Sequence, residues 1–255
     1  MKTRIVLFIC CLALSACVTG QGAGGKGLSN LSAKEVDLRL NLAESHINNR
    51  QPQLALQELF ILEPSAKHLS RYHFDLAMTY IGLDELEKAR DSFTRAVDID
   101  TNFAEAWNNL GKILEALNRD QEAEQAYLKA FNILTYVTPE FAAYNLGRLY
   151  LRQGRIAEAE QFGRKALARN WRYVPAYTLL ADAFVAQNRM EEAEAVLKSG
   201  LEADMNSYST MLALAEHQVR LGKNIEALEM FQRIVTQSPH SNEAKVAQDY
   251  LELLQ

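Results

Sequence analysis

This chain has no excess of basic residues over acidic ones, and long apolar runs, proline and runs of β-branched residues are scarce in it. The formal net charge of −5 at pH 7 provides no basic surface for nucleic acid. After residue 14, no apolar stretch is long enough to span a membrane. The 255 residues include only 5 Pro and 12 Gly, and several of these glycines lie between residues 20 and 27. The remainder is therefore expected to be compact, and its wealth of Ala, Leu, Glu and Gln favours helix.

The first residues have the pattern of a secretory signal. Met1 to Arg4 carry two positive charges, Ile5 to Leu14 are apolar, and small residues come next. An apolar segment of this length is too short for a transmembrane helix and is typical of a signal peptide. We predict that residues 1–16 are removed.

Cysteine usage indicates how the mature chain begins. Cys10 and Cys11 lie in the removed segment, so Cys17 is the one cysteine that remains. A lone thiol in an oxidising compartment is a liability unless it is chemically consumed. Leu14-Ser15-Ala16-Cys17 resembles the bacterial lipobox, which implies that Cys17 is acylated and becomes the first residue of the mature protein. Val18 stands where an inner-membrane retention signal would have Asp, so the resemblance implies a cell outer membrane location, lipid-anchored and facing the periplasm. The alternative is an ordinary secretory signal with an incidental cysteine.

Residues 17–35 are rich in glycine and imitate two nucleotide motifs. Gly20-x4-Gly25-Lys26 matches most of a P-loop, but Gly27 takes the place of the magnesium-binding Ser or Thr. The dinucleotide fingerprint is also matched, but neither motif is preceded by a strand. We predict a flexible tether over residues 17–35 and no nucleotide cofactor.

An internal repeat determines the expected architecture. Alanines recur at intervals of 34, 34, 36, 34 and 34 residues, each with a small residue twelve positions earlier and a leucine before that. These alanines are Ala55, Ala89, Ala123, Ala159, Ala193 and Ala227. The unit containing Trp107, Gly111, Ala123 and Tyr127 matches the tetratricopeptide pattern of two antiparallel helices. The resemblance implies an all-α fold, a right-handed tetratricopeptide-repeat superhelix with six helix pairs and a C-terminal capping helix.

The repeat divides the chain into units. They are expected at residues 36–69, 70–103, 104–139, 140–173, 174–207 and 208–241, with the capping helix at 242–255. Unit four departs from the pattern in two ways. Two extra residues precede it in "ILTYVTPEF", where Pro139 is expected in the first turn of the next helix. Gly163 replaces a bulky residue and leaves space that a neighbour must fill.

No residue pattern indicates catalysis. The histidines are scattered and form neither a metal-spaced cluster nor a nucleophile–base arrangement; they are His46, His68, His73, His217 and His240. We predict no catalytic residue, no metal site, no cofactor and no small-molecule substrate. The chain is expected not to be an enzyme.

The tetratricopeptide resemblance implies a concave groove lined by the first helix of each unit. Its expected lining mixes apolar anchors with amides that can grip the backbone of a peptide. The predicted partner-binding residues are Phe74, Met78, Asn108, Asn109, Lys112, Phe141, Tyr144, Asn145 and Arg148. The alternative for each is a core position between neighbouring units.

The lipobox, the short glycine-rich tether and six repeats together resemble the outer-membrane pilotins of type IV pilus systems, the PilF/PilW/Tgl group. The resemblance implies a lipoprotein that binds a secretin subunit and assists its assembly in the outer membrane. A second interpretation is an adaptor lipoprotein that recruits other cell-envelope enzymes or assembly factors. The sequence leaves open the client, the oligomeric state, the binding face and the pilus or secretion system.

Overall fold

The computed structural model describes residues 31–254, and within that range the chain forms 13 α-helices and no strand. The helices are α1 (Ala33–Asn48), α2 (Pro52–Ala66), α3 (Ser70–Gly82), α4 (Leu86–Ile99), α5 (Ala104–Ala116), α6 (Asp120–Asn132), α7 (Pro139–Arg152), α8 (Ile156–Arg169), α9 (Pro175–Ala186), α10 (Met190–Ala203), α11 (Tyr208–Arg220), α12 (Asn224–Gln237) and α13 (Asn242–Leu254). The predicted signal peptide, Cys17 and the tether before residue 31 lie outside the described residues.

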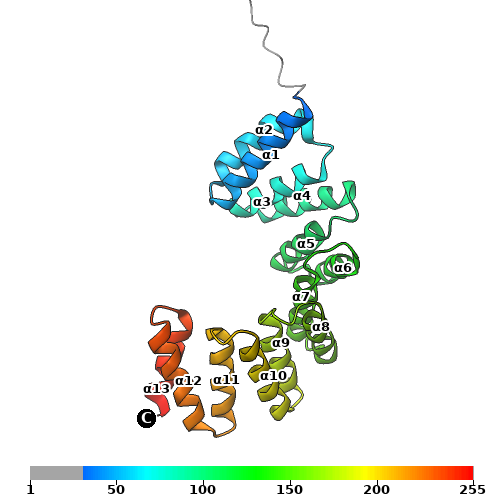
Figure 1. Ribbon diagram of the computed structural model, residues 1–255. Coiled ribbons are helices and arrows are strands. Elements are labelled where there is room, and N and C mark those ends of the chain that lie inside the picture. The colour runs from blue at the N-terminus through cyan, green and yellow to red at the C-terminus, as the bar shows by residue number, and fades with distance from the viewer. Residues whose placement is uncertain (1–30, 255) are drawn as a thin grey trace, which may run out of the picture.

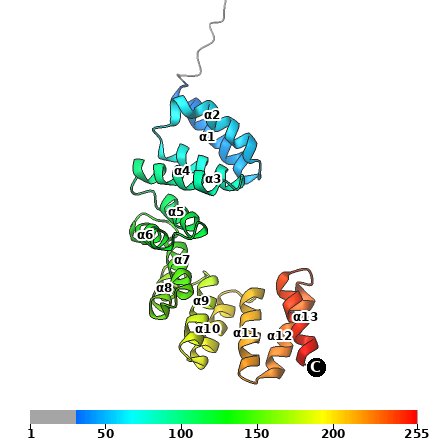
Figure 2. The same cartoon turned by 180° about the vertical axis from the view of Figure 1, so that it is seen from behind.

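Successive helices pack as hairpins, and the hairpins stack into an open superhelix. Each odd-numbered helix from α1 to α11 packs against the helix that comes after it, and each pair contacts the next. Figures 1 and 2 show the stack descending from α1 to α8 and then turning sideways through α9 to α13. The predicted all-α tetratricopeptide superhelix is confirmed, with α13 packed over α12 at its end.

The repeat alanines are the points of closest helix approach. None of the six has any exposed surface; they are Ala55, Ala89, Ala123, Ala159, Ala193 and Ala227. A Cβ added to Gly163 would lie 2.9 Å from the Leu180 side chain, so this leucine fills the space that was expected there. At Gly111 an added Cβ would come within 2.6 Å of the buried Tyr127 ring. Small residues at these positions therefore set the spacing between helices.

The turn between the two helices of each unit contains a residue in the left-handed backbone region. These residues share a positive φ of 56–75° and repeat with the spacing of the alanines; they are Arg50, Asp84, Asn118, Gly154, Asn188 and Gly222. Gly, Asn and Asp adopt this conformation at the lowest cost, and five of the six positions carry one of them. The left-handed turn residues therefore repeat at the same intervals as the buried alanines.

The first helix begins earlier than the repeat pattern predicts. The Ser32 hydroxyl accepts a hydrogen bond from the Glu35 backbone N–H at 3.3 Å, and the Glu35 carboxylate accepts one from the Ser32 N–H at 2.8 Å. This capping box starts α1 at Ala33. The tether predicted over residues 17–35 is therefore wrong for residues 33–35, which are helical.

The link between units three and four holds the two inserted residues. It spans residues 133–138, and Pro139 lies in the first turn of α7, as predicted. The Tyr136 ring turns inward and packs against Ala104, Ala130 and Ala142. The longer link thus inserts an aromatic ring between α5 and α7.

Asp75 is a buried carboxyl group on α3. Among the described residues its Oδ2 atom accepts no hydrogen bond, and its nearest cation is the Arg71 guanidinium at 4.0 Å. Arg71 also contacts Asp37 and Glu44. Burial raises the pKa of Asp75 to about 7; Arg71 opposes the increase and Glu44 adds to it.

Asp75 is expected to make the protein less stable as the pH rises. An Asp pKa of about 4 in the unfolded chain is lower than the folded value of about 7. The native state therefore holds the extra proton, and its contribution to stability is complete below pH ~4 and lost as the pH passes through 7. The variant Asp75→Asn cannot titrate, so its melting temperature should fall less than that of the wild type between pH 5 and pH 8. Equal decreases in calorimetric scans would contradict this assignment.

Candidate peptide-binding cleft

A cleft of about 410 Å³ opens between α5 and α7, two first helices of neighbouring units. First helices line the concave surface of a tetratricopeptide superhelix. The lining comes from α5, the link after α6, α7 and the turn before α9. Its residues are Glu105, Asn108, Asn109, Lys112, Tyr136, Thr138, Phe141, Asn145 and Tyr173. We call this site the α5–α7 cleft.

Three asparagines provide its amide groups. The Asn145 Nδ2 group donates to the Asn108 Oδ1 atom at 3.0 Å and so joins the two helices. The Asn109 Nδ2 group donates to the Glu105 carbonyl at 2.9 Å. Within the described residues, the Asn108 amide nitrogen and the Asn109 and Asn145 amide oxygens make no hydrogen bond. The cleft thus offers both donors and acceptors to a peptide backbone.

Aromatic rings form the wall on the α7 side. The Tyr173 ring lies edge-on to Phe141 at 5.1 Å and to Tyr144 at 5.5 Å between ring centroids. Phe141 remains 39% exposed, so part of its ring is open to a ligand. Burial raises the pKa of Tyr173 to about 12, so its hydroxyl is neutral near pH 7. A large apolar side chain could pack against Phe141 here.

A cation lies at the rim of the cleft. The Lys112 side chain is exposed and forms no ion pair among the described residues. Glu105 is the one carboxylate in the lining. The rim can therefore attract an acidic group of a bound segment, while the floor provides amides and rings.

A buried carboxylate joins α5 to α7 beside the cleft. The Glu115 side chain is only 6% exposed. It accepts hydrogen bonds from the Tyr127 hydroxyl at 2.9 Å, from Arg148 at 2.9 Å and from Arg152 at 2.6 Å. Arg152 also bonds Asp120 at 2.6 Å. These bonds hold α7 at a fixed position relative to α5 and α6.

The structure brings five of the nine predicted groove residues into one site. The five that line the α5–α7 cleft are Asn108, Asn109, Lys112, Phe141 and Asn145. Tyr144 lies behind them against Tyr173. Their role in binding a partner stays a prediction.

Three predicted residues lie elsewhere or are already engaged. Arg148 was expected to bind a partner in the groove, but its guanidinium is paired with Glu115. Phe74 was expected to face solvent, but its ring packs between Phe93 and Phe103, at 5.5 and 4.9 Å. Rings of its own unit therefore cover Phe74, while a carboxylate of the preceding unit occupies Arg148.

Met78, the third of these residues, lines a different and smaller cavity, of about 230 Å³, with Ile47, Arg50 and Pro52. The repeat pattern did not predict that Tyr136, Thr138 and Tyr173 line the α5–α7 cleft, which they enter from links between units. For Tyr136 and Thr138, the two inserted residues before Pro139 were the one sequence feature that could have indicated a different link. Tyr173 has no such feature, because it lies in a turn outside the helical repeat.

No cluster suited to a metal ion occurs among residues 31–254. In the same range, none of the helices is both long and apolar enough to cross a bilayer. His73 is half-buried, and its Nε2 atom lies 2.9 Å from the Lys67 carbonyl. Burial lowers the pKa of His73. The Nε2 atom of buried His217 lies 2.9 Å from the Met190 carbonyl.

Comparison with models of known protein families identifies the family to which this chain belongs. Models of the tetratricopeptide repeat match residues 70–103, 103–170 and 150–217. This chain is a tetratricopeptide-repeat protein. Repeats of this family build scaffolds that bind peptides and proteins through the groove, and such scaffolds are typically non-enzymatic.

Among tetratricopeptide-repeat proteins, the chain is similar to two pilus factors. It is 26% identical over 175 residues to the type IV pilus assembly protein PilF of Pseudomonas aeruginosa, covering 67% of this chain and 68% of that protein. The crystal structure of PilW, a widely conserved type IV pilus biogenesis factor, superimposes with a TM-score of 0.74 at 24% identity, covering 85% of this chain and all of PilW. The PilW likeness shows a shared fold.

Other curated proteins match over a small part of their length. The human protein O-mannosyl-transferase TMTC3 is 26% identical over 167 residues, which are 60% of this chain and 18% of that protein. The chain spans no more than 19% of the length of the first three curated relatives it matches.

Proposed function

We propose that this protein is an outer-membrane lipoprotein that binds a secretin subunit and assists its assembly during type IV pilus biogenesis. The observation that carries the proposal is the similarity to PilF, which extends over two thirds of both chains. The PilW fold supports it, because it accounts for 85% of this chain. The lipobox ending at Cys17 supports the lipid anchor and the periplasm-facing location.

The partner segment would lie along the α5–α7 cleft, and the protein would act by binding without chemistry. An extended segment needs backbone donors and acceptors, which the amides of Asn108, Asn109 and Asn145 provide. An apolar side chain of the segment would pack on Phe141, and a carboxylate would approach Lys112. Rings and amides side by side suit a peptide better than a small polar metabolite.

Lipidation at Cys17 is tested by metabolic labelling. Cells given a radioactive fatty acid should label the wild-type protein and leave Cys17→Ser unlabelled. The labelled protein should fractionate with outer membranes, because several acyl chains anchor a soluble domain stably. A labelled serine variant, or an unlabelled wild type, would exclude the anchor.

The assembly role is tested by deleting the gene in its own host. The loss of detergent-resistant secretin multimers and of surface pili is expected, and the wild-type gene should restore both. If secretin multimers persist after deletion, the pilotin role is excluded and recruitment of other envelope enzymes or assembly factors replaces it. Complementation with Cys17→Ser separates the need for the anchor from the need for the repeats.

A further inference from the structure

An ion pair recurs at the last three junctions between neighbouring units. At each of these junctions, a basic residue stands immediately before the second helix of one unit. Its side chain pairs with a glutamate of the preceding unit, and this glutamate directly follows the repeat alanine in the sequence. These pairs are Arg155–Glu124 (2.7 Å), Arg189–Glu160 (2.6 Å) and Lys223–Glu194 (2.6 Å). The three carboxylates are 10–18% exposed, so each pair fills the junction between units.

The junction between units two and three lacks this pair. Arg119 is the basic residue before α6, but the position after Ala89 is occupied by Arg90 instead of a glutamate. The two positions that hold a cation and a carboxylate at the later junctions are therefore both occupied by arginines here, Arg119 and Arg90. Arg119 turns to Glu122 in its own unit, at 2.6 Å, and Arg90 turns to its neighbour Asp91, at 2.5 Å.

Arg119 also lacks the aromatic contact that Arg155 and Arg189 have. The Arg155 guanidinium lies 4.1 Å from the centroid of the Tyr150 ring, and that of Arg189 lies 4.3 Å from the centroid of the Phe184 ring. The corresponding residue before Arg119 is Leu114. This junction therefore has neither the ion pair nor the ring that closes the next two.

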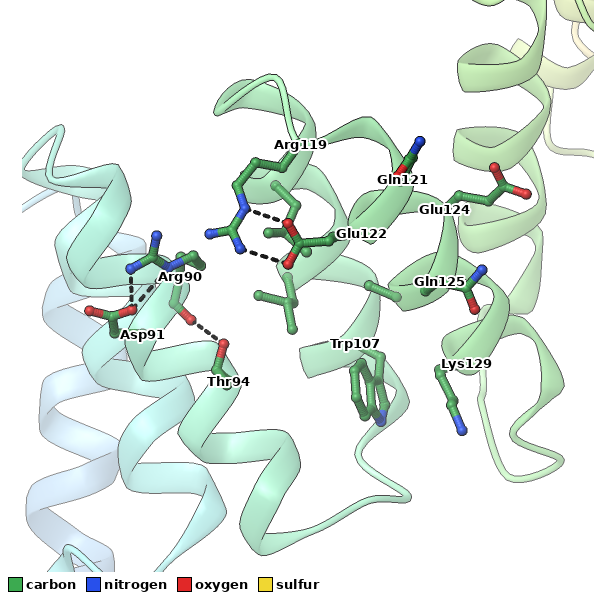
Figure 3. Close-up of a pocket in the computed structure, with 13 residues that line it drawn as sticks. Arg90, Asp91, Thr94, Trp107, Arg119, Gln121, Glu122, Glu124, Gln125 and Lys129 are labelled. Atoms are coloured by element: carbon green, nitrogen blue, oxygen red, sulfur yellow. Dashed lines mark hydrogen bonds and ion pairs between the residues drawn. The ribbon is translucent and has the colours of Figure 1, made fainter.

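A groove of about 980 Å³ occupies this junction, between α4 and α6. Its floor is apolar and includes Trp107, Leu110 and Leu114 from α5, while Arg90 and Arg119 line its sides. Figure 3 shows Arg119 extending toward α4 and each arginine bonded to a neighbouring carboxylate. We call this site the α4–α6 groove. It uses a face of α5 other than the one that lines the α5–α7 cleft.

We propose that the α4–α6 groove binds a segment of a partner protein in which an Asp or Glu stands beside a large apolar residue. The carboxylate takes the place that a glutamate of the preceding unit occupies at the later junctions, between Arg90 and Arg119. The apolar residue packs on Trp107 and Leu110. Asp91 and Glu122 are 68% and 55% exposed, so their pairs with the arginines are weak and easily exchanged for the incoming carboxylate. This site is independent of the proposed secretin-binding role.

A selection with random peptides tests the chemistry of this groove. Random dodecapeptides displayed on phage are selected on the immobilised full-length protein and, in parallel, on Arg90→Glu and Arg95→Glu. Arg90→Glu restores the missing ion pair with Arg119 and should close the groove without loss of thermal stability. Arg95 is exposed on the same helix outside the groove, so Arg95→Glu is the control for the same change in charge.

The wild type and Arg95→Glu should both enrich a group of peptides with Asp or Glu beside Leu, Phe or Trp that Arg90→Glu does not enrich. Peptides that bind the α5–α7 cleft are enriched on all three proteins, because Arg90 does not line that cleft, and are set aside. The enriched peptide should bind at least about tenfold more weakly to Arg90→Glu, and the same loss is expected when its acidic residue is changed to the amide. Enrichment without acidic residues, or equal enrichment on Arg90→Glu, would overturn the proposal. Concentration-dependent dimerisation of the wild type that Arg90→Glu abolishes would assign the groove to a second copy and would also overturn it. If Arg90→Glu fails to fold, Arg90→Gln gives the same comparison.

Discussion

Replacing Glu115 by alanine should lower the free energy of unfolding by roughly 3 kcal/mol, because the loss of one member of a buried ion pair leaves its partners uncompensated. The Glu115 carboxylate accepts hydrogen bonds from Tyr127, Arg148 and Arg152. The Tyr127 hydroxyl belongs to a residue with no exposed surface, so it would lose this acceptor inside the core. Both arginines are nearly half exposed and can turn to water, which keeps the loss at the lower end of the usual range.

The measurement is urea unfolding monitored by circular dichroism at 222 nm. Glu192 is a suitable control, because it also pairs with an arginine at 2.6 Å but is 53% exposed. Glu192→Ala should leave the unfolding midpoint nearly unchanged, since exposed pairs contribute little. Similar midpoints for Glu115→Ala and the wild type would mean that the network does not hold α5 against α7.

Replacing Phe141 by alanine should weaken partner binding by roughly thirtyfold, since an aromatic anchor at the centre of an interface contributes about 2 kcal/mol or more. Phe141 lines the α5–α7 cleft and is 39% exposed, so its ring is available to a ligand. Its side chain contacts Tyr173 at the surface, and its removal should leave the helical content unchanged.

Binding to the purified periplasmic region of the host secretin would be measured by isothermal titration calorimetry. Phe60 is the matched control: it is an exposed phenylalanine, 55% accessible, on α2, outside the cleft. Phe60→Ala should bind as the wild type does. Equal affinities for Phe141→Ala and Phe60→Ala would remove Phe141 from the interface.

The fold is explained by features that repeat in the sequence. The alanines at 34- to 36-residue intervals are the fully buried contacts, and the turns have the same spacing. Periodicity predicts this much because each unit solves the same packing problem against its neighbours. The start of α1 was misplaced because a repeat pattern carries no information on a capping box such as Ser32 with Glu35.

The site was harder to predict, since it depends on contacts between units and on the links between them. The helical register places Phe74 and Arg148 on the exposed face of first helices. In the structure, however, the Phe74 ring stacks on Phe103 and the Arg148 guanidinium pairs with Glu115. Tyr173 enters the cleft from a turn, where helical periodicity does not apply. A repeat pattern thus predicts which face is exposed, while individual neighbours decide which side chains on it are free.

The most direct measurement of the central claim is site-specific photocrosslinking in the native host. A benzophenone amino acid would be placed at Lys112, an exposed residue at the rim of the α5–α7 cleft, and in a parallel strain at Phe60. We expect irradiation to yield a covalent adduct with the secretin subunit from position 112 and none from position 60. If position 112 gives no secretin adduct while the protein is folded and present in the membrane, the cleft is not where this protein binds the secretin.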